Sequence, residues 1–254
     1  MCVAKQELER LGYSVKSLGL FENDNGEIED ADVVLLPVPT TRDGKNVFCP
    51  DTDKKIPLDA VYQAKENALI LSCGCGFENT NYIDYLKLDS FCLLNAVPTA
   101  EGAIARAIND TPFCLWQSKV LVIGNGRVAK ILTDRLVGLK CDVTVSARKT
   151  RDFAYLESLG IKHIHTNDVA KKADNFDIIF NTIDVPIFDD INTLKSCYLY
   201  DLSTKGCIDF EAARQNGIKA VKLPGIPGKV APHTAGKIIA QTVNELIGEW
   251  VCKI

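Results

Sequence analysis

The sequence of 254 residues lacks long apolar runs, an excess of positive charge and clusters of histidine. No apolar stretch reaches the ~18 residues that a membrane span requires. Lysine and arginine number 29 against 33 acidic residues, a net charge of −4, and no basic stripe is present, so a nucleic-acid-binding surface is not expected. Residues 1–7 lack the apolar core of a secretory signal. We therefore expect a cytoplasmic chain that binds neither membranes nor nucleic acid.

The ten cysteines are scattered along the chain rather than spaced as a disulfide framework. In a cytoplasmic chain, thiols stay reduced and behave as small buried apolar groups. Only Cys73 and Cys75 lie close together, in a Cys-Gly-Cys-Gly segment with no second pair or histidine cluster to complete a zinc site. We interpret that segment as a turn and expect no metal. Six cysteines lie in or beside apolar segments: Cys49, Cys92, Cys114, Cys141, Cys197 and Cys252.

Helical and strand patterns alternate throughout the chain, which is typical of βαβ units and parallel sheets. The apolar runs at 33–36 and 69–71 do not alternate with polar residues, as expected for strands covered on both faces. Strands are predicted at 13–17, 32–36, 68–72, 90–94, 118–123, 142–146, 177–181, 197–201 and 219–221. Helices are predicted at 3–11, 58–66, 79–87, 99–109, 127–137, 151–159, 209–216 and 234–250.

One glycine-rich motif has the context of a dinucleotide site. Gly124-Asn125-Gly126-Arg127-Val128-Ala129 directly follows the predicted strand 118–123 and opens the predicted helix 127–137. In such a motif the first glycine makes a tight turn and the second lets the backbone approach a pyrophosphate. The free amides and the dipole at the helix start attract the phosphates. The alternative is a glycine-rich turn that binds nothing.

The next strand indicates which dinucleotide is bound. An NAD site usually has an acid at the end of the second strand, where it binds the ribose 2′-hydroxyl. Here that end carries Ser146, Arg148 and Lys149, and the nearby acid, Asp142, lies at the other end of the strand. Cations and a hydroxyl suit a 2′-phosphate, so we predict that NADP is preferred to NAD.

Several segments resemble the family of dipicolinate synthase A subunits. They are NAVPTAEG at 95–102, the loop at Gly124, VTVSAR at 143–148 and, above all, LPGIPGKVAPHTAG at 223–236. The resemblance extends from about residue 3 to the end of the chain. Two features depart from the family: the chain begins inside what resembles the family's first helix, and residues 201–209 lack the usual Pro-Gly-Gly.

The resemblance implies an α/β fold with two doubly wound parallel-sheet domains. Residues 1–95 would form a flavodoxin-like substrate domain whose first strand is missing, and 96–117 a linker helix. Residues 118–232 would form the Rossmann dinucleotide-binding domain, and a helix at 233–254 would return to the first domain.

The resemblance also implies an activity. Family members oxidise a dihydrodipicolinate-type dicarboxylate to dipicolinate during sporulation, with NADP or NAD, and work with a flavoprotein-like B subunit. A small dicarboxylate substrate, self-association into a homo-oligomer and a partner B subunit are therefore expected. A D-2-hydroxyacid dehydrogenase has the same two-domain build, but loop 201–206 offers Lys205 rather than arginine as the carboxylate-binding residue. A nucleotide-sensing module without chemistry is the third alternative.

Ligands of doubly wound sheets bind beyond the carboxyl ends of the strands, so the candidate residues come from the loops there. We expect these loops to converge on a cleft between the domains. Substrate contacts are predicted from Thr40, Thr41, Arg42, Asn95 and Thr99. Cofactor contacts are predicted from Gly124, Asn125, Gly126, Arg127, Val128, Ser146, Arg148, Lys149, Thr182, Ile183, Leu202 and Ser203.

Catalytic groups are expected among Lys205, Lys229 and His233. His233 is the candidate base, because it begins the terminal helix, whose dipole favours a neutral imidazole. The family has a lysine at a position resembling His233, which suggests a donor role instead. His163 and His165 lie in a predicted short strand away from the loop ends, and we interpret them as structural.

Overall fold

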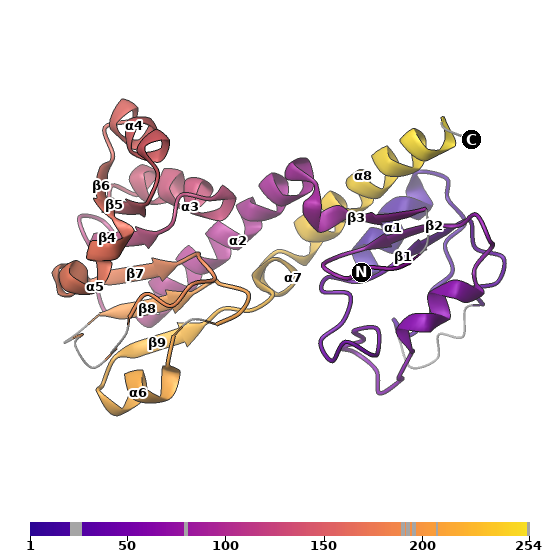
Figure 1. The fold of residues 1–254 in the computed structure, drawn as a ribbon, viewed down its shortest axis with the longest axis horizontal. Helices are drawn as coiled ribbons and strands as arrows, with labels where there is room; N and C mark the ends of the chain where they lie inside the picture. Colours follow the sequence, from indigo (N-terminus) through magenta and orange to yellow (C-terminus); the bar gives the residue numbers. More distant parts are fainter. Residues whose placement is uncertain are drawn as a thin grey trace. The chain divides into compact units, whose positions relative to one another are not determined.

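The computed structural model describes residues 1–20, 27–78, 81–188, 191, 194, 197–206 and 208–252. Its contacts divide the chain into two compact units (Figure 1). The first unit joins Met1–Asn95 to Pro232–Ile254, and the second is Ala96–Ala231. Among the described residues, no helix is long and apolar enough to cross a membrane. The prediction of an α/β chain with two parallel sheets is confirmed.

The second unit contains a six-stranded sheet in the order β6-β5-β4-β7-β8-β9, and every neighbouring pair is parallel. The order reverses between β4 and β7. In sequence terms this is 3-2-1-4-5-6, the order of dinucleotide-binding sheets, and it confirms the Rossmann prediction. The strands are β4 (Lys119–Ile123), β5 (Asp142–Ala147), β6 (Lys162–His165), β7 (Ile178–Asn181), β8 (Tyr198–Asp201) and β9 (Lys219–Lys222).

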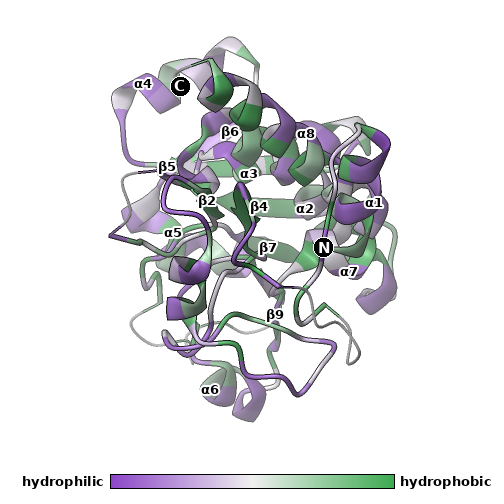
Figure 2. Ribbon diagram, turned by 90° about the vertical axis from the view of Figure 1, so that its right-hand side faces the viewer, coloured by the Kyte–Doolittle hydropathy of each residue, from purple (hydrophilic) through white to green (hydrophobic). Residues whose placement is uncertain are grey.

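Alternate residues of the central strands face two separate cores. Val120 and Val122 of β4 pack with α2, α3 and α4, whereas Leu121 and Ile123 pack with α5 and α6. The strands are therefore apolar on both faces, and they stand out as green in Figure 2. The helices are α2 (Asp89–Asp110), α3 (Arg127–Gly138), α4 (Thr150–Ser158), α5 (Val169–Lys172), α6 (Phe210–Gln215) and α7 (Ile226–Val230), with 3-10 turns η3 (Thr166–Asp168) and η4 (Ala173–Asn175).

The first unit contains a parallel sheet in the order β1-β2-β3. Leu69 and Leu71 of β2 pack against α1 and α8, while Ile70 packs against Val61 of η1 on the other face. The sheet is thus covered on both sides. The elements are α1 (Cys2–Arg10), β1 (Val33–Leu35), η1 (Leu58–Gln63), β2 (Leu69–Ser72), β3 (Tyr82–Asp84), η2 (Tyr85–Lys87) and α8 (Pro232–Val251).

Three predicted elements of the first unit are wrong. Residues 13–17 belong to no helix or strand; instead the Tyr13 hydroxyl donates to Asn244 Oδ1 of α8 at 2.8 Å. The helix predicted at 79–87, whose Asn79 lies outside the described residues, is replaced by β3 and η2. The strand predicted at 90–94 is the start of α2, which runs through Pro98 and therefore begins ten residues before the predicted helix 99–109.

Candidate dinucleotide site

The carboxyl ends of the second unit's strands form one edge of its sheet. The register pairs Ile123 with Ser146 on one side and with Asn181 on the other, and Asn181 with Asp201. The loops after β4, β5, β7 and β8 therefore leave the sheet side by side. This is the edge at which doubly wound sheets bind ligands, and the reversal between β4 and β7 marks the place on it.

Gly124 makes the turn that leaves β4. Its φ of +106° is one that residues with side chains rarely adopt. A Cβ there would lie 2.6 Å from Ile183 Cγ2 and 2.7 Å from Thr182 Oγ1. The Gly124 amide donates to the carbonyl and the hydroxyl of Ser146, at 3.1 and 3.3 Å. Gly124 thus fixes the turn between neighbouring loops. Its own amide is bonded to Ser146 and is not a free donor for a phosphate.

Gly126 and the start of α3 have the open surroundings that a phosphate needs. A Cβ on Gly126 would meet no atom within 4 Å. No side chain caps α3, so its first turn keeps backbone donors for a ligand. The Asn125 side-chain nitrogen is buried without an acceptor among the described residues, a further donor left unsatisfied. Arg127 is exposed and Val128 half-buried on the same turn. These residues fit a pyrophosphate.

The end of β5 presents cations and no acid. Arg148 and Lys149 directly follow the strand, are exposed, and form no ion pair with any described residue. Asp142 lies at the opposite end of β5, where its carboxylate binds Lys162 Nζ at 2.6 Å. Asp142 is therefore not placed to bind the ribose. This agrees with the sequence analysis, which found no acid at the end of this strand.

Ser146 does not have the position predicted for it. Its side chain is fully buried, and its hydroxyl accepts from the Gly124 amide and, at 3.4 Å, from Thr166 Oγ1. A buried hydroxyl with these partners supports the glycine turn and has no surface for a 2′-phosphate. The prediction of a direct contact is corrected to a structural role.

The loops after β7 and β8 lie beside the glycine turn. Thr182 and Ile183 are the residues that Gly124 faces, and the Thr182 hydroxyl donates to the Ile123 carbonyl at 2.8 Å. Leu202 is half-buried against the sheet core, and Ser203 is 7% exposed. The structure therefore gathers these predicted cofactor residues along one edge.

Three acidic or amide side chains between these loops were not predicted. Asn181 and Asp201 are fully buried and bonded to each other, Asn181 Nδ2 donating to Asp201 Oδ1 at 2.9 Å. Asp184 is exposed and accepts two backbone amides of the next loop. A polar residue that ends a buried strand was the available signal, because such residues sit at the ligand edge.

In the first unit, Thr40 has a structural role rather than the predicted substrate contact. It is fully buried, and its hydroxyl accepts the Cys73 amide at 2.8 Å. Its own amide donates to the Cys73 carbonyl at 3.2 Å. Thr41 is half-buried, and its hydroxyl donates to Asp43 Oδ1 at 3.2 Å. Both threonines therefore build the loop that carries Arg42.

Arg42 is exposed and directly follows Thr41. Its guanidinium lies over the Phe48 ring, 3.9 Å from the centroid, and it forms no ion pair with a described residue. Stacking leaves the edges of the guanidinium free for the two oxygens of a carboxylate. Of the predicted substrate residues in this loop, Arg42 has a suitable position.

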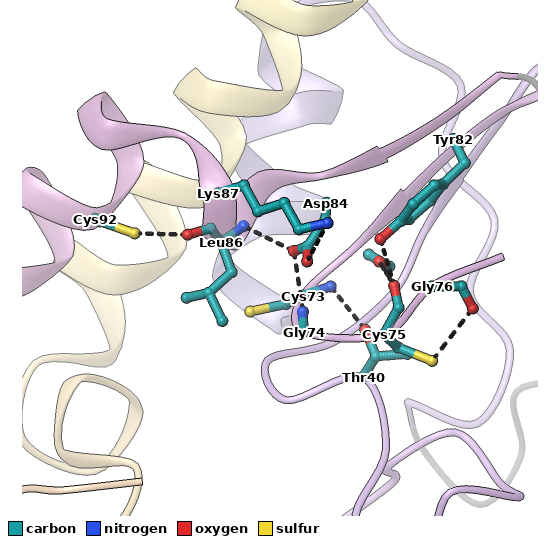
Figure 3. A network of polar contacts seen from close by, with 11 residues as sticks. Thr40, Cys73, Gly74, Cys75, Gly76, Tyr82, Asp84, Leu86, Lys87 and Cys92 are labelled. Atoms are coloured by element: carbon teal, nitrogen blue, oxygen red, sulfur yellow. Dashed lines mark hydrogen bonds and ion pairs between the residues drawn. The ribbon is translucent and has the colours of Figure 1, made fainter. Parts of the chain in front are cut away.

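The Cys-Gly-Cys-Gly segment follows β2 as a fixed turn (Figure 3). The hydroxyls of Ser72 and Tyr82 both donate to the Cys75 carbonyl at 2.6 Å. The Asp84 carboxylate accepts the Gly74 amide at 3.0 Å. These contacts support the interpretation as a turn.

The described cysteines are not grouped with other metal-binding side chains. No described group of three metal-binding side chains exists, and no disulfide joins the described cysteines. Burial raises the pKa of Cys73 to about 12 and that of Cys197 to about 11, which keeps both thiols neutral. Cys114 and Cys252 are exposed, contrary to the prediction of burial.

The remaining predicted residues lie on several elements. Lys205 follows β8, Lys229 lies on α7 and His233 begins α8, and all three are exposed. Asn95 and Thr99 are half-buried and lie one helical turn apart on α2. The sequence predicted that they follow a strand at 90–94, and this placement is wrong.

The other two histidines have structural surroundings. His163 and His165 lie on β6, as predicted. Both rings contact Phe153 of α4, with centroids 5.1 and 6.1 Å apart. His163 also lies 3.6 Å from a Glu157 carboxylate oxygen.

Comparison with known proteins finds that the chain is similar to one subunit of an enzyme. No family model matches the chain. The dipicolinate synthase A subunit of Bacillus subtilis (strain 168) is 34% identical over 153 residues, which cover 59% of this chain and 52% of that protein. The aligned part thus spans about half the length of this curated relative.

Solved structures extend the likeness to almost the whole chain. The crystal structure of the dipicolinate synthase A chain from Bacillus subtilis matches with a TM-score of 0.85 and 26% identity, covering 99% of this chain and 93% of that one. A transhydrogenase from Sinorhizobium meliloti shares the fold, with a TM-score of 0.66, 15% identity and coverage of 97% and 80%. This chain is therefore similar to the dipicolinate synthase A subunit of Bacillus subtilis in sequence and in fold, and it shares the fold of the transhydrogenase.

Proposed function

We propose that this protein is an NADP-dependent oxidoreductase that converts a dihydrodipicolinate-type dicarboxylate to dipicolinate, a step of sporulation, in partnership with a B subunit. The observation that carries the proposal is the open turn at Gly126 and the uncapped start of α3, at the reversal of strand order. Backbone donors at that point suit a pyrophosphate. The relative that matches in sequence and in fold is named for dipicolinate synthesis.

The proposed chemistry assigns roles to residues of this chain. A bound NADP would supply the acceptor for a hydride from the dihydro ring. The ring also loses one proton, for which His233 is the proposed base, so that the products are dipicolinate, reduced cofactor and one proton. Arg42, Lys205 and Lys229 are the proposed partners of the two carboxylates.

A direct assay tests this function. The protein is incubated with freshly prepared dihydrodipicolinate and NADP, with and without a candidate B subunit, and dipicolinate is measured by mass spectrometry. We expect dipicolinate in equal amount to reduced cofactor. Tight cofactor binding with no product under either condition would favour the nucleotide-sensing alternative.

The role of His233 has its own test. Replacing the base by glutamine, which hydrogen-bonds but does not take up a proton, should lower turnover by ~100-fold. The affinity for NADPH, measured by titration, should stay unchanged. Full turnover of His233→Gln would reject the role of base and favour that of a hydrogen-bond donor.

The preference for NADP rests on the end of β5. Arg148 and Lys149 are unpaired with described acids, and no acid occupies the usual ribose position. The double variant Arg148→Gln, Lys149→Gln should bind NADPH at least ~10-fold more weakly, since bonds to charged groups contribute about 1.5–3 kcal/mol. NADH affinity should not change. Lys171→Gln on α5 is the matched control, and equal loss for both cofactors would contradict the preference.

A further inference from the structure

The loops that follow β7 and β8 are joined by side-chain bonds to backbone. Asp201 Oδ1 accepts Asn181 Nδ2 at 2.9 Å and the Ser203 amide at 3.0 Å. Asn181 Oδ1 in turn accepts the Ile183 amide at 3.3 Å. The first residues of both loops are therefore fixed from inside the sheet, by two fully buried side chains.

Further from the sheet, Asp184 alone crosses between the loops among the described residues. Its Oδ1 accepts the consecutive amides of Thr204 and Lys205, at 2.6 and 2.9 Å. The turn closes where the Gly206 amide donates to Ser203 Oγ at 3.3 Å, with Gly206 at a φ of +73°. Successive amides before a left-handed residue form a concave anion receptor, and here the Asp184 carboxylate fills it.

Lys205 is the residue whose backbone this carboxylate holds. Its side chain is exposed, and its ammonium forms no ion pair with a described residue. A lysine ammonium is carried on a flexible four-carbon stem, so fixing the backbone narrows the region that the ammonium can occupy. Asp184 Oδ1 is engaged by two amides, so the carboxylate acts on the loop backbone rather than on a ligand.

We propose that Asp184 is a positioning residue for Lys205: it fixes the backbone from which the lysine binds a carboxylate of the substrate. This inference rests on the proposed function for the identity of that substrate. The hydrogen bonds themselves do not, so the two can fail separately.

We call the two hydrogen bonds from the Thr204 and Lys205 amides to Asp184 the Asp184 clamp. Amide hydrogen exchange of the full chain tests this clamp without any substrate. Asp184→Ala should speed exchange at Thr204 and Lys205 by about tenfold, because two bonds to a charged acceptor are lost. Asp184→Asn keeps an acceptor oxygen and should stay within threefold of the parent. Val185→Ala, the exposed neighbour, is the matched control. Unchanged exchange in Asp184→Ala would overturn the proposal.

A double-variant cycle tests whether Asp184 acts through Lys205. In Asp184→Ala the KM for dihydrodipicolinate should rise about tenfold, with NADPH affinity unchanged, and Asp184→Asn should restore it. Added to Lys205→Met, Asp184→Ala should cause no further loss. Additive losses, or equal defects in Asp184→Asn and Asp184→Ala, would overturn the proposal.

If the parent protein shows no turnover, the same cycle is read from calorimetric binding of dipicolinate to the NADP-saturated protein. Absence of both turnover and dipicolinate binding would reject the proposed function and, with it, the lysine's role as carboxylate partner. Faster exchange in Asp184→Ala would then show that the clamp exists without that ligand.

Discussion

The two glycines of the nucleotide loop have opposite surroundings, and this separates folding from binding. Gly124→Ala would place a Cβ 2.6 Å from Ile183 at a φ of +106°. It should lower the free energy of unfolding by at least about 1–2 kcal/mol. Gly126→Ala meets no atom and should change the free energy of unfolding by less than about 0.5 kcal/mol.

Denaturant unfolding measures the stability of both variants, and titration with NADPH measures the effect of Gly126→Ala on binding. A methyl group at position 126 stands where the pyrophosphate would approach, so affinity should fall by about tenfold or more. If Gly126→Ala binds NADPH as well as the parent does, the phosphates do not approach this turn.

Single residues were predicted well where the backbone decides the role and less well where side-chain direction does. The glycine turn follows from strand, glycine spacing and helix, and it lies where the sequence placed it. Ser146 and Thr40 were assigned to ligands because they lie near strand ends. Their hydroxyls instead bind neighbouring backbone amides inside the protein. A sequence gives a residue's distance from a strand end, but not whether its side chain points into the core.

At the scale of elements, the second unit was predictable because its central strands are apolar on both faces and are bounded by turn residues. The first unit was harder. Residues 90–94 form a short apolar run, which periodicity cannot assign to helix or strand. The predicted helix 99–109 starts directly after Pro98, yet α2 continues through this proline. Residues 13–17 are predicted as a strand. In the structure Tyr13 bonds to Asn244 of α8, and Tyr13 and Val15 pack in the same apolar cluster as α8 instead of pairing with a strand.

The packing of α8 on α1 depends on a small residue. A Cβ on Gly236 would lie 2.5 Å from Val3 Cβ and 3.0 Å from the Ala4 amide nitrogen. Gly236→Ala should therefore destabilise the protein by about 1–3 kcal/mol, because backbone cannot move aside as a flexible side chain can. Gly248→Ala, on the same helix with open space around it, should be neutral or stabilising by up to ~1 kcal/mol. Thermal unfolding of both variants measures the difference, and equal effects would refute the close approach.

At the scale of the whole molecule, the chain enters the second unit at Ala96 and leaves it at Ala231. The first unit is thus built from both ends of the sequence, and α8 completes its core. Each unit has its own sheet and its own apolar clusters. The proposed dinucleotide residues belong entirely to the second unit.

Cofactor binding should therefore stabilise one unit more than the other. At a free NADPH concentration of 100 times Kd, a folded site gains about 2.7 kcal/mol. We expect amide exchange to slow mainly within Ala96–Ala231, while the core amides of β2 and α8 in the first unit change little. A tenfold loss of affinity in Gly126→Ala should lower this gain to about 1.4 kcal/mol at the same ligand concentration. Equal protection of both units would mean that NADPH also binds residues of the first unit, and the dinucleotide contacts would have to be reassigned.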